Sequence, residues 1–177
     1  GMGVSQHVHG TDNCRAMISV ALMTGQIGRE GSGLHPLRGQ NNVQGASDAG
    51  LIPMMYPDYK GVNVASVKAM FEDLWGTELS DEPGLTVVET MDAVHDGSVT
   101  GMYVEGENPA MSDPDLHHAR GALAKLQHLV VQDLYVTETA MYADVVLPAS
   151  AWPEKDGTAS NTNRTVQMGR QAVNPPG

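Results

Sequence analysis

The sequence predicts an α/β fold, namely a Rossmann-like parallel sheet with flanking helices that forms part of a three-layer αβα arrangement. Two observations support this prediction. In the second half of the 177 residues, three short apolar runs alternate with helical segments in the order β-α-β-α-β. Short connections of this kind favour parallel strands joined by right-handed crossovers. The first half ends in a glycine-rich stretch, residues 28–50, which predicts an irregular N-terminal segment.

Three helices are predicted before the sheet, over residues 11–24, 64–75 and 86–95. Each combines recurring apolar positions with a glycine within two residues of its end, where a left-handed backbone closes a helix. Thr11 or Asp12 is suited to cap the first of them through a side-chain oxygen. The loop between the second and third helices is acidic and predicted to be exposed.

The sheet and its crossovers follow in the second half. Buried strands are predicted over residues 102–104, 129–131 and 145–147. Asp113 and Pro114 have the residue types of a helix cap and a first helical position, which predicts a helix running to Leu126. A second, shorter helix is predicted near residues 137–142.

Polar residues follow two of these strands directly. Asn108 lies after the first strand, and Gln132 and Asp133 lie after the second. Ligands of parallel sheets bind beyond the carboxyl ends of the strands, so these residues are candidate binding residues. Asp133 is suited to accept two hydrogen bonds from a guanine edge, or to cap the next helix through the amides of Tyr135 and Val136. Residue chemistry leaves both interpretations open.

Arg38 stands at the centre of the glycine-rich stretch, in a run Arg-Gly-Gln-Asn-Asn that ends at Asn42. A planar guanidinium between glycine-containing turns is a rigid fork for a carboxylate or a phosphate. The same group could instead brace the carbonyl oxygens of its own loop. Both interpretations stay open at this level.

Composition excludes several classes of function. The formal net charge is −11 with only ten Lys and Arg, which argues against nucleic-acid binding. No apolar run reaches the roughly 18 residues of a membrane span. The one cysteine, Cys14, lies in a helical apolar pattern that predicts a small core residue. It excludes a disulfide, a Cys₂ zinc site or an iron–sulfur cluster held by this chain alone, and it fits a cytoplasmic protein. No set of histidines and acids predicts a metal ligand here.

A longer match then connects these features. Residues 36–45, PLRGQNNVQG, closely resemble a loop of formate dehydrogenase large subunits, which belong to the molybdopterin oxidoreductase superfamily. Further matches run in family order along nearly the whole chain, at residues 2–6, 22–28, 106–109, 131–133 and 143–149. The chain therefore resembles an internal segment of such a subunit.

The resemblance implies an oxidoreductase that converts formate to carbon dioxide at a molybdenum or tungsten ion held by two pterin guanine dinucleotides. Arg38 matches the arginine that orients formate, and it is the one catalytic residue implied. The residues that resemble contacts to the molybdopterin guanine dinucleotide are Met2, Gln6, Gly39, Gln40, Asn108, Ser112, Gln132, Asp133 and Thr137. Among them, Asn108 and Ser112 resemble diphosphate contacts, and Gln132, Asp133 and Thr137 resemble contacts to the guanosine.

Several family features match no residue of this chain. The metal-binding cysteine or selenocysteine and the iron–sulfur ligands are expected in sequence before Gly1, and a barrel domain after Gly177. The isolated chain is therefore expected to be inactive and to need the remaining segments or subunits of a formate dehydrogenase. Residues 1–45 are expected to end one pterin-binding α/β domain, residues 46–148 to form the dinucleotide-binding domain, and residues 149–177 to be a strip of a third.

Two alternatives remain at this level. One is a segment of another molybdopterin oxidoreductase, such as a nitrate reductase, although Arg38 within its full loop argues against it. The other is a stand-alone module that binds a nucleotide or a partner without catalysis. Exposed apolar surface would favour the segment of an enzyme and predict a homo-oligomer through unpaired sheet, whereas a closed monomer would favour the module.

Overall fold

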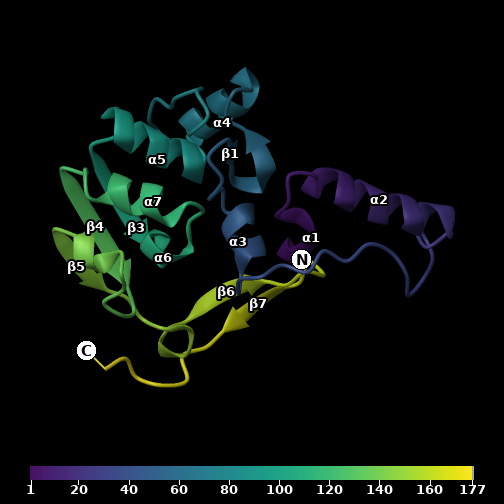
Figure 1. Ribbon diagram of the computed structural model, residues 1–177. Helices are drawn as coiled ribbons and strands as arrows, with labels where there is room; N and C mark the ends of the chain where they lie inside the picture. The colour runs from purple at the N-terminus through teal and green to yellow at the C-terminus, as the bar shows by residue number, and fades with distance from the viewer. Residues whose placement is uncertain (177) are drawn as a thin grey trace. The chain divides into compact units, whose positions relative to one another are not determined.

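The computed structural model describes residues 1–176 and divides into two compact units (Figure 1). The first unit comprises Gly1–Ile52, Tyr56–Tyr59 and Gly157–Met168, and the second comprises the other described residues. The chain therefore leaves the first unit and returns to it much later. No helix among the described residues is long and apolar enough to cross a membrane.

The first unit is mostly helical and carries one hairpin. Its elements are α1 (Met2–Ser5), α2 (Gly10–Met23), α3 (Val43–Asp48), the 3₁₀ turn η1 (Pro57–Tyr59), β6 (Gly157–Ser160) and most of β7 (Val166–Gly169). The predicted helix at α2 is confirmed, and Gly25 closes it at φ 66°. The predicted cap is wrong, because α2 begins after His9, which makes no side-chain capping bond. A Cβ on Gly10 would lie 1.9 Å from the Ser5 carbonyl oxygen, so glycine permits this earlier start.

The second unit is built on a parallel sheet. Its elements are β2 (Lys60–Gly61), α4 (Ala65–Trp75), α5 (Val87–Asp96), β3 (Gly101–Glu105), α6 (Pro109–Ser112), α7 (Leu116–Leu123), β4 (His128–Asp133), η2 (Ala140–Tyr142), β5 (Val145–Pro148) and η3 (Trp152–Glu154). The short strand β1 (Met55–Tyr56) lies where the chain passes between the units. The sheet has the order β3-β4-β5 with both pairs parallel, so the predicted α/β fold and the positions of its strands are confirmed. The prediction that the third strand is buried is wrong, because every residue of β5 is exposed.

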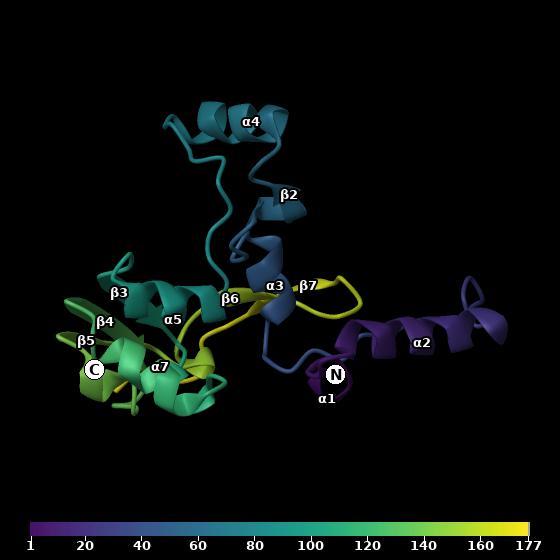
Figure 2. The ribbon, with the colours of Figure 1, turned by 45° about the horizontal axis from the view of Figure 1, so that its top comes forward.

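The core of the second unit lies on one face of this sheet. Leu129 and Val131 of β4 are almost fully buried against Leu123 of α7 and Met91 of α5. Each such aliphatic side chain contributes about 1.5–3 kcal/mol when buried. Figure 2 shows α5 and α7 beside one another against the strands. The apolar sides of these two helices therefore cover one face of the sheet.

The opposite face of the sheet is more open. Tyr103, Val130 and Val145 are aligned across the three strands by the parallel registers. Tyr103 is 53% exposed and Val145 is 40% exposed, although both residue types usually pack in a sheet. Of the two apolar layers that a doubly covered sheet needs, this unit supplies one.

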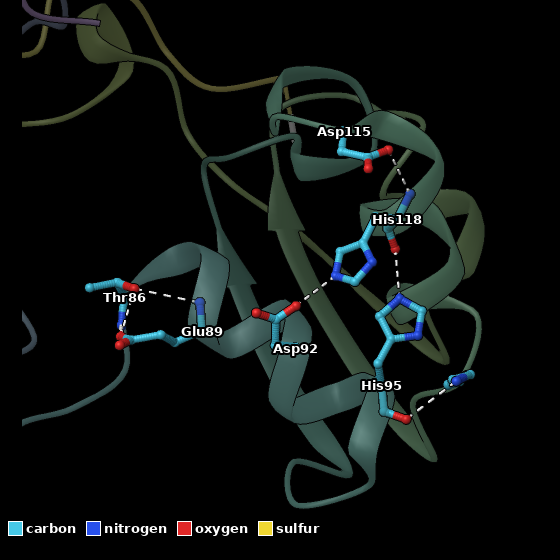
Figure 3. Close-up of polar contacts among 7 residues, drawn as sticks. Thr86, Glu89, Asp92, His95, Asp115 and His118 are labelled. Atoms are coloured by element: carbon cyan, nitrogen blue, oxygen red, sulfur yellow. Dashed lines mark hydrogen bonds and ion pairs between the residues drawn. The ribbon is translucent and has the colours of Figure 1, made fainter. Parts of the chain in front are cut away.

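A polar network joins α5 to α7 next to the core (Figure 3). His118 of α7 lies 2.9 Å from Asp92 of α5, measured between Nε2 and Oδ1. The His95 ring lies against the His118 ring, and its Nε2 is 2.9 Å from the His118 carbonyl oxygen. At the start of α5, Thr86 and Glu89 form a reciprocal capping box. The histidine contacts join the two helices, whereas the capping box stabilises the start of α5.

The helix predicted from Asp113 is divided differently in the structure. Asn108 and Pro109 start α6, and Asp115 caps α7 by accepting a hydrogen bond from the His118 amide, so the predicted cap at Asp113 is wrong. Asp113 instead ends α6 in an extended backbone, which the following proline favours. Its Oδ2 is buried with no hydrogen bond within residues 1–176, and this burial raises the pKa of its carboxyl group.

Candidate functional site

Four of the predicted site residues in the first unit line one cavity of about 620 Å³. Met2 comes from α1, while Arg38, Gly39 and Gln40 come from the irregular segment between α2 and α3. The fifth, Gln6, ends α1 through a hydrogen bond from its amide to the Met2 carbonyl and is not among the lining residues. Cys14 also lines this cavity and is only partly buried, so the prediction of a core cysteine is wrong.

The Arg38 side chain is available for a ligand. Its guanidinium makes no hydrogen bond and no ion pair within the described residues, and the residue is exposed. The interpretation that Arg38 braces its own loop therefore has no support in the structure. Because an arginine presents a planar fork of N–H donors, this group is suited to a carboxylate or phosphate that enters the cavity.

Asn42 fixes the loop that carries Arg38, a role that sequence analysis missed. Its side-chain Nδ2 donates to the Thr158 carbonyl oxygen at 3.1 Å, and its Oδ1 accepts from the Ser160 amide at 2.8 Å. The amide group thus pairs with the β6 backbone as a neighbouring strand would. Asn42 adopts a left-handed backbone, at φ 59°, just before α3. Asparagine tolerates this conformation better than most residues do.

In the second unit, the loops after β3 and β4 are tied together by Asn108 and Thr139. The Asn108 Oδ1 accepts from the Thr139 amide at 3.1 Å and from its hydroxyl at 2.7 Å. The same hydroxyl accepts from the Ala110 amide at 3.0 Å, and Thr139 is completely buried. The Asn108 Nδ2 donates to Glu138 at 2.7 Å, and this bond is the main cause of the lowered pKa of Glu138.

These bonds limit what two of the predicted diphosphate contacts can do. The Asn108 Oδ1 already accepts two hydrogen bonds, so one Nδ2 hydrogen is left for a ligand. The Ser112 hydroxyl donates to the Asn108 carbonyl oxygen at 3.1 Å, which leaves Ser112 as an acceptor. A diphosphate at this loop would therefore be bound by the side-chain Nδ2 of Asn108, which can still donate, more than by the Ser112 hydroxyl.

The three residues predicted to contact guanosine lie at the end of β4 and just beyond it. Gln132 accepts a hydrogen bond from the Tyr103 hydroxyl. The Asp133 Oδ1 accepts from the Leu134 amide at 2.6 Å. The Thr137 hydroxyl accepts from the Ala140 amide at 3.3 Å, at the start of η2. The prediction that Asp133 caps through Tyr135 and Val136 is not what the structure shows, since its bond goes to the adjacent residue.

The donor and acceptor groups of this second set fit a guanine nucleotide. The Asp133 Oδ2 has no hydrogen bond within residues 1–176, and a carboxylate pairs well with the two N–H groups on a guanine edge. The Thr137 hydroxyl has a hydrogen left to donate. Asp133 and Thr137 both follow the core of β4, where ligands of parallel sheets bind.

Comparison with known proteins places the chain in a family. The family model described as molybdopterin oxidoreductase matches residues 1–177. The alpha subunit of an F420-dependent formate dehydrogenase from Methanocaldococcus jannaschii is 51% identical over 99% of this chain. An F420-dependent formate dehydrogenase 1 alpha subunit from Methanococcus maripaludis is 46% identical, and a putative formate dehydrogenase from Staphylococcus haemolyticus is 44% identical, each over 99% of this chain.

The match covers a limited part of these relatives. The chain spans 26% of the two archaeal subunits and 18% of the staphylococcal protein. Because the family model matches along the full length of the chain, the assignment does not depend on one local motif. The chain therefore belongs to the molybdopterin oxidoreductase family.

Proposed function

We propose that the chain is part of the catalytic subunit of a formate dehydrogenase, which oxidises formate to carbon dioxide, and that Arg38 orients the formate. The observation that carries this proposal is the unpaired Arg38 guanidinium, in a cavity that Met2, Gly39 and Gln40 also line. The names of the relatives support formate over nitrate as the substrate.

The role of Arg38 follows from its geometry. Paired N–H donors hold both oxygens of a carboxylate in one plane, which directs the C–H bond of formate away from the guanidinium. A fixed positive charge also stabilises negative charge on these oxygens as the bond breaks. A Cβ added to Gly39 would meet no atom within 4 Å, so the space beside Gly39 in the cavity is open.

We further propose that the chain contacts a molybdopterin guanine dinucleotide that carries molybdenum or tungsten. When bound, that group supplies the centre that accepts two electrons from formate. Met2, Gln6, Gly39 and Gln40 would hold it in the first unit. In the second unit, Asn108 and Ser112 would contact a diphosphate, and Gln132, Asp133 and Thr137 would recognise guanosine through the donors and acceptors described above.

The family assignment also guides a proposal for the rest of the enzyme. We propose that residues 1–45, 46–148 and 149–177 contribute to three different domains of the complete subunit. The isolated chain would then lack formate oxidation and need the remaining segments for it. One cysteine in 177 residues favours a reducing compartment, so we place the enzyme in the cytoplasm. A stand-alone nucleotide-binding module remains the second candidate, favoured only by the unpaired carboxylate oxygen of Asp133.

Formate turnover tests the role of Arg38. In the complete enzyme, Arg38→Lys keeps the charge but loses the planar fork, so kcat/KM for formate should fall by about 100-fold or more. Arg29→Lys is the matched control, because Arg29 is exposed and lies outside the cavity. Equal turnover in the two variants would contradict the proposed role.

Nucleotide binding tests the second unit separately. Calorimetric titration of the chain with GDP should show saturable binding that Asp133→Ala abolishes. Asp81→Ala, an exposed acid in the loop between α4 and α5, should leave it unchanged. No heat of binding at millimolar GDP would rule out a usable guanosine pocket in the isolated chain.

A further inference from the structure

A second cavity in the first unit brings Arg38 together with a residue that the sequence analysis did not select. The cavity has a volume of about 910 Å³, and its lining includes Arg38 and Arg164. Arg38 comes from the irregular segment before α3, and Arg164 comes from the turn between β6 and β7. The two arginines are separated by most of the chain, so no local motif would have joined them.

Both guanidinium groups lack a protein partner. Neither Arg38 nor Arg164 makes a side-chain hydrogen bond or an ion pair within residues 1–176. Among the other arginines, Arg15, Arg120 and Arg170 have side-chain partners, whereas Arg29 has none within the described residues and does not line the cavity. Both guanidinium groups therefore keep their N–H donors available to an anion that enters the cavity.

The β6–β7 turn is held in place next to the cavity. The Arg164 amide donates to the Asn161 carbonyl oxygen at 2.8 Å, and Arg164 has a left-handed backbone at φ 67°. Thr162 of the same turn lies 3.5 Å from the His35 ring, measured between Oγ1 and Nε2. Together with the Asn42 contacts to β6, these bonds fix the turn beside the segment that carries Arg38.

Two acidic residues, Asp48 and Asp58, also border the cavity. Asp48 accepts a hydrogen bond from the Gln44 side-chain amide at 2.6 Å, and Gln44 also donates to the Tyr59 hydroxyl. Asp58 is the second carboxylate of the lining. Among the described residues, neither arginine of the cavity forms an ion pair with these acids.

We propose that Arg164 and Arg38 together bind one oxyanion, and that Arg164 is thus a second anion-binding residue of this site. Two guanidinium groups match a ligand with two negative charges or several acceptor oxygens. The cavity is much larger than formate and lies in the usual range for ligand-sized pockets. The phosphate class of oxyanion, phosphate or diphosphate, therefore fills this cavity better than a lone carboxylate, and such a ligand would compete with formate for Arg38.

The inference rests on the cavity and does not require that the enzyme oxidises formate. Formate and the diphosphate of a nucleotide cofactor share the chemistry that Arg38 and Arg164 recognise. Separate titrations of the 177-residue chain with pyrophosphate, phosphate and formate at constant ionic strength show which of these ligands the two arginines bind most tightly. We expect the order of affinity to be pyrophosphate, then phosphate, then formate.

Variants locate the binding. Arg164→Gln and Arg38→Gln should each weaken pyrophosphate binding by about tenfold or more, since each removes charge-assisted bonds. The double variant should lose less than the product of the two effects, because both side chains hold the same ligand. Arg29→Gln removes the same charge outside the cavity and should change the affinity less than about twofold, since salt screens distant charges.

A second experiment uses the wild-type chain. Phenylglyoxal reacts with accessible arginines, and mass spectrometry gives the extent of reaction at each one. Pyrophosphate should protect Arg38 and Arg164 together while Arg29 continues to react. The proposal is overturned if Arg164→Gln behaves as Arg29→Gln does, if Arg164 is not protected, or if the wild-type chain shows no saturable pyrophosphate binding. If the wild-type chain binds pyrophosphate but the complete wild-type enzyme does not oxidise formate, only the proposed function is contradicted.

Discussion

At the scale of single residues, Thr139 shows how one buried hydroxyl organises two loops of the proposed nucleotide site. Its side chain donates to Asn108 and accepts from the Ala110 amide. Because Thr139 and Ala110 are completely buried, the Ala110 amide could not turn to water if the hydroxyl were absent. The hydroxyl therefore stabilises the loop after β3.

Thr139→Val should therefore destabilise the chain by about 1–3 kcal/mol, since it leaves a buried amide and a carbonyl oxygen with one bond fewer. Denaturant unfolding measures this loss. Thr139→Ser retains the hydroxyl and should cost less than the valine variant. A valine variant as stable as the wild type would mean that the hydroxyl contacts contribute nothing to folding.

Asp113 presents the opposite case, a polar atom that the fold leaves unsatisfied. Burial raises the pKa of its carboxyl group, so the folded chain holds the proton more tightly than the unfolded chain does. Stability linked to this group is therefore highest below the unfolded pKa of 3.8 and is lost as the pH rises through the folded pKa.

Asp113→Asn removes the buried charge and should raise the thermal midpoint at pH 7. The gain should shrink as the pH falls towards 3, because the wild-type carboxyl is then protonated as well. Thermal unfolding of both proteins across this range is the measurement. A midpoint lower than that of the wild type at pH 7 would show that the carboxylate has a favourable partner in solution.

At the scale of elements, α5 depends on a cap whose strength varies with pH. Hydrogen bonds from the Thr86 hydroxyl and amide lower the pKa of Glu89 below its ordinary value of 4.5. The stability that this bond contributes is present above the unfolded pKa and is lost as the pH falls through the folded pKa.

Thr86→Val should lower the thermal midpoint by about 2–4 °C at pH 7, as expected for the loss of a helix cap in a chain of this length. The difference from the wild type should narrow below the pH at which Glu89 is protonated. Thr90→Val alters a threonine in the same helix but leaves the capping box intact, and it serves as the control. An equal deficit at pH 7 and pH 3 would contradict a role for the Glu89 charge.

Elements that depend on local chemistry could be predicted from the sequence, whereas those that depend on distant contacts could not. The strand cores and the closing glycines at 25, 76 and 97 follow from periodicity and backbone freedom, and each lies where expected. The cap at Asp113 was wrong because a second aspartate follows two residues later, and only the fold selects Asp115 as the cap of α7. Arg38 stood out through its own glycine-rich loop.

The partners of that loop gave no local signal. Asn42 reaches residues 116 and 118 positions further along the chain, and Arg164 belongs to a turn that no sequence pattern singled out. Thr139 lies 31 positions from Asn108. Such pairs emerge only when the topology has brought the elements together, so sequence patterns locate the loops of the site but not the contacts that hold them.

At the scale of the whole molecule, the open face of the parallel sheet bears on how the chain behaves alone. Apolar residues at the sheet's two outer strands are exposed there, and β5 forms one edge of the sheet. In the proposed complete subunit, the remaining polypeptide, about three quarters of the archaeal relatives' length, would supply the cover. In a solution of the isolated chain, a second copy of the chain can cover this apolar face instead.

We therefore predict that the isolated chain self-associates as its concentration rises from micromolar to hundreds of micromolar. Multi-angle light scattering gives the mass directly. Val145→Lys places a charge on the edge strand and should shift association to concentrations about tenfold higher or more. Lys125→Glu is the control, because Lys125 lies outside the strands, and it should leave the association unchanged. A strict monomer at every concentration would favour the stand-alone module instead.

The clamp that Asn42 forms with β6 also has a consequence for biosynthesis. The residues that complete its pairing lie up to 118 positions downstream, and ribosomes add roughly 5–20 residues each second. The loop that carries Arg38 must therefore wait roughly 6–24 seconds after its own synthesis before its anchor exists. During that interval the early helices are exposed to the chaperones and proteases of the cell, so the abundance of the protein should depend on translation speed across the intervening sheet.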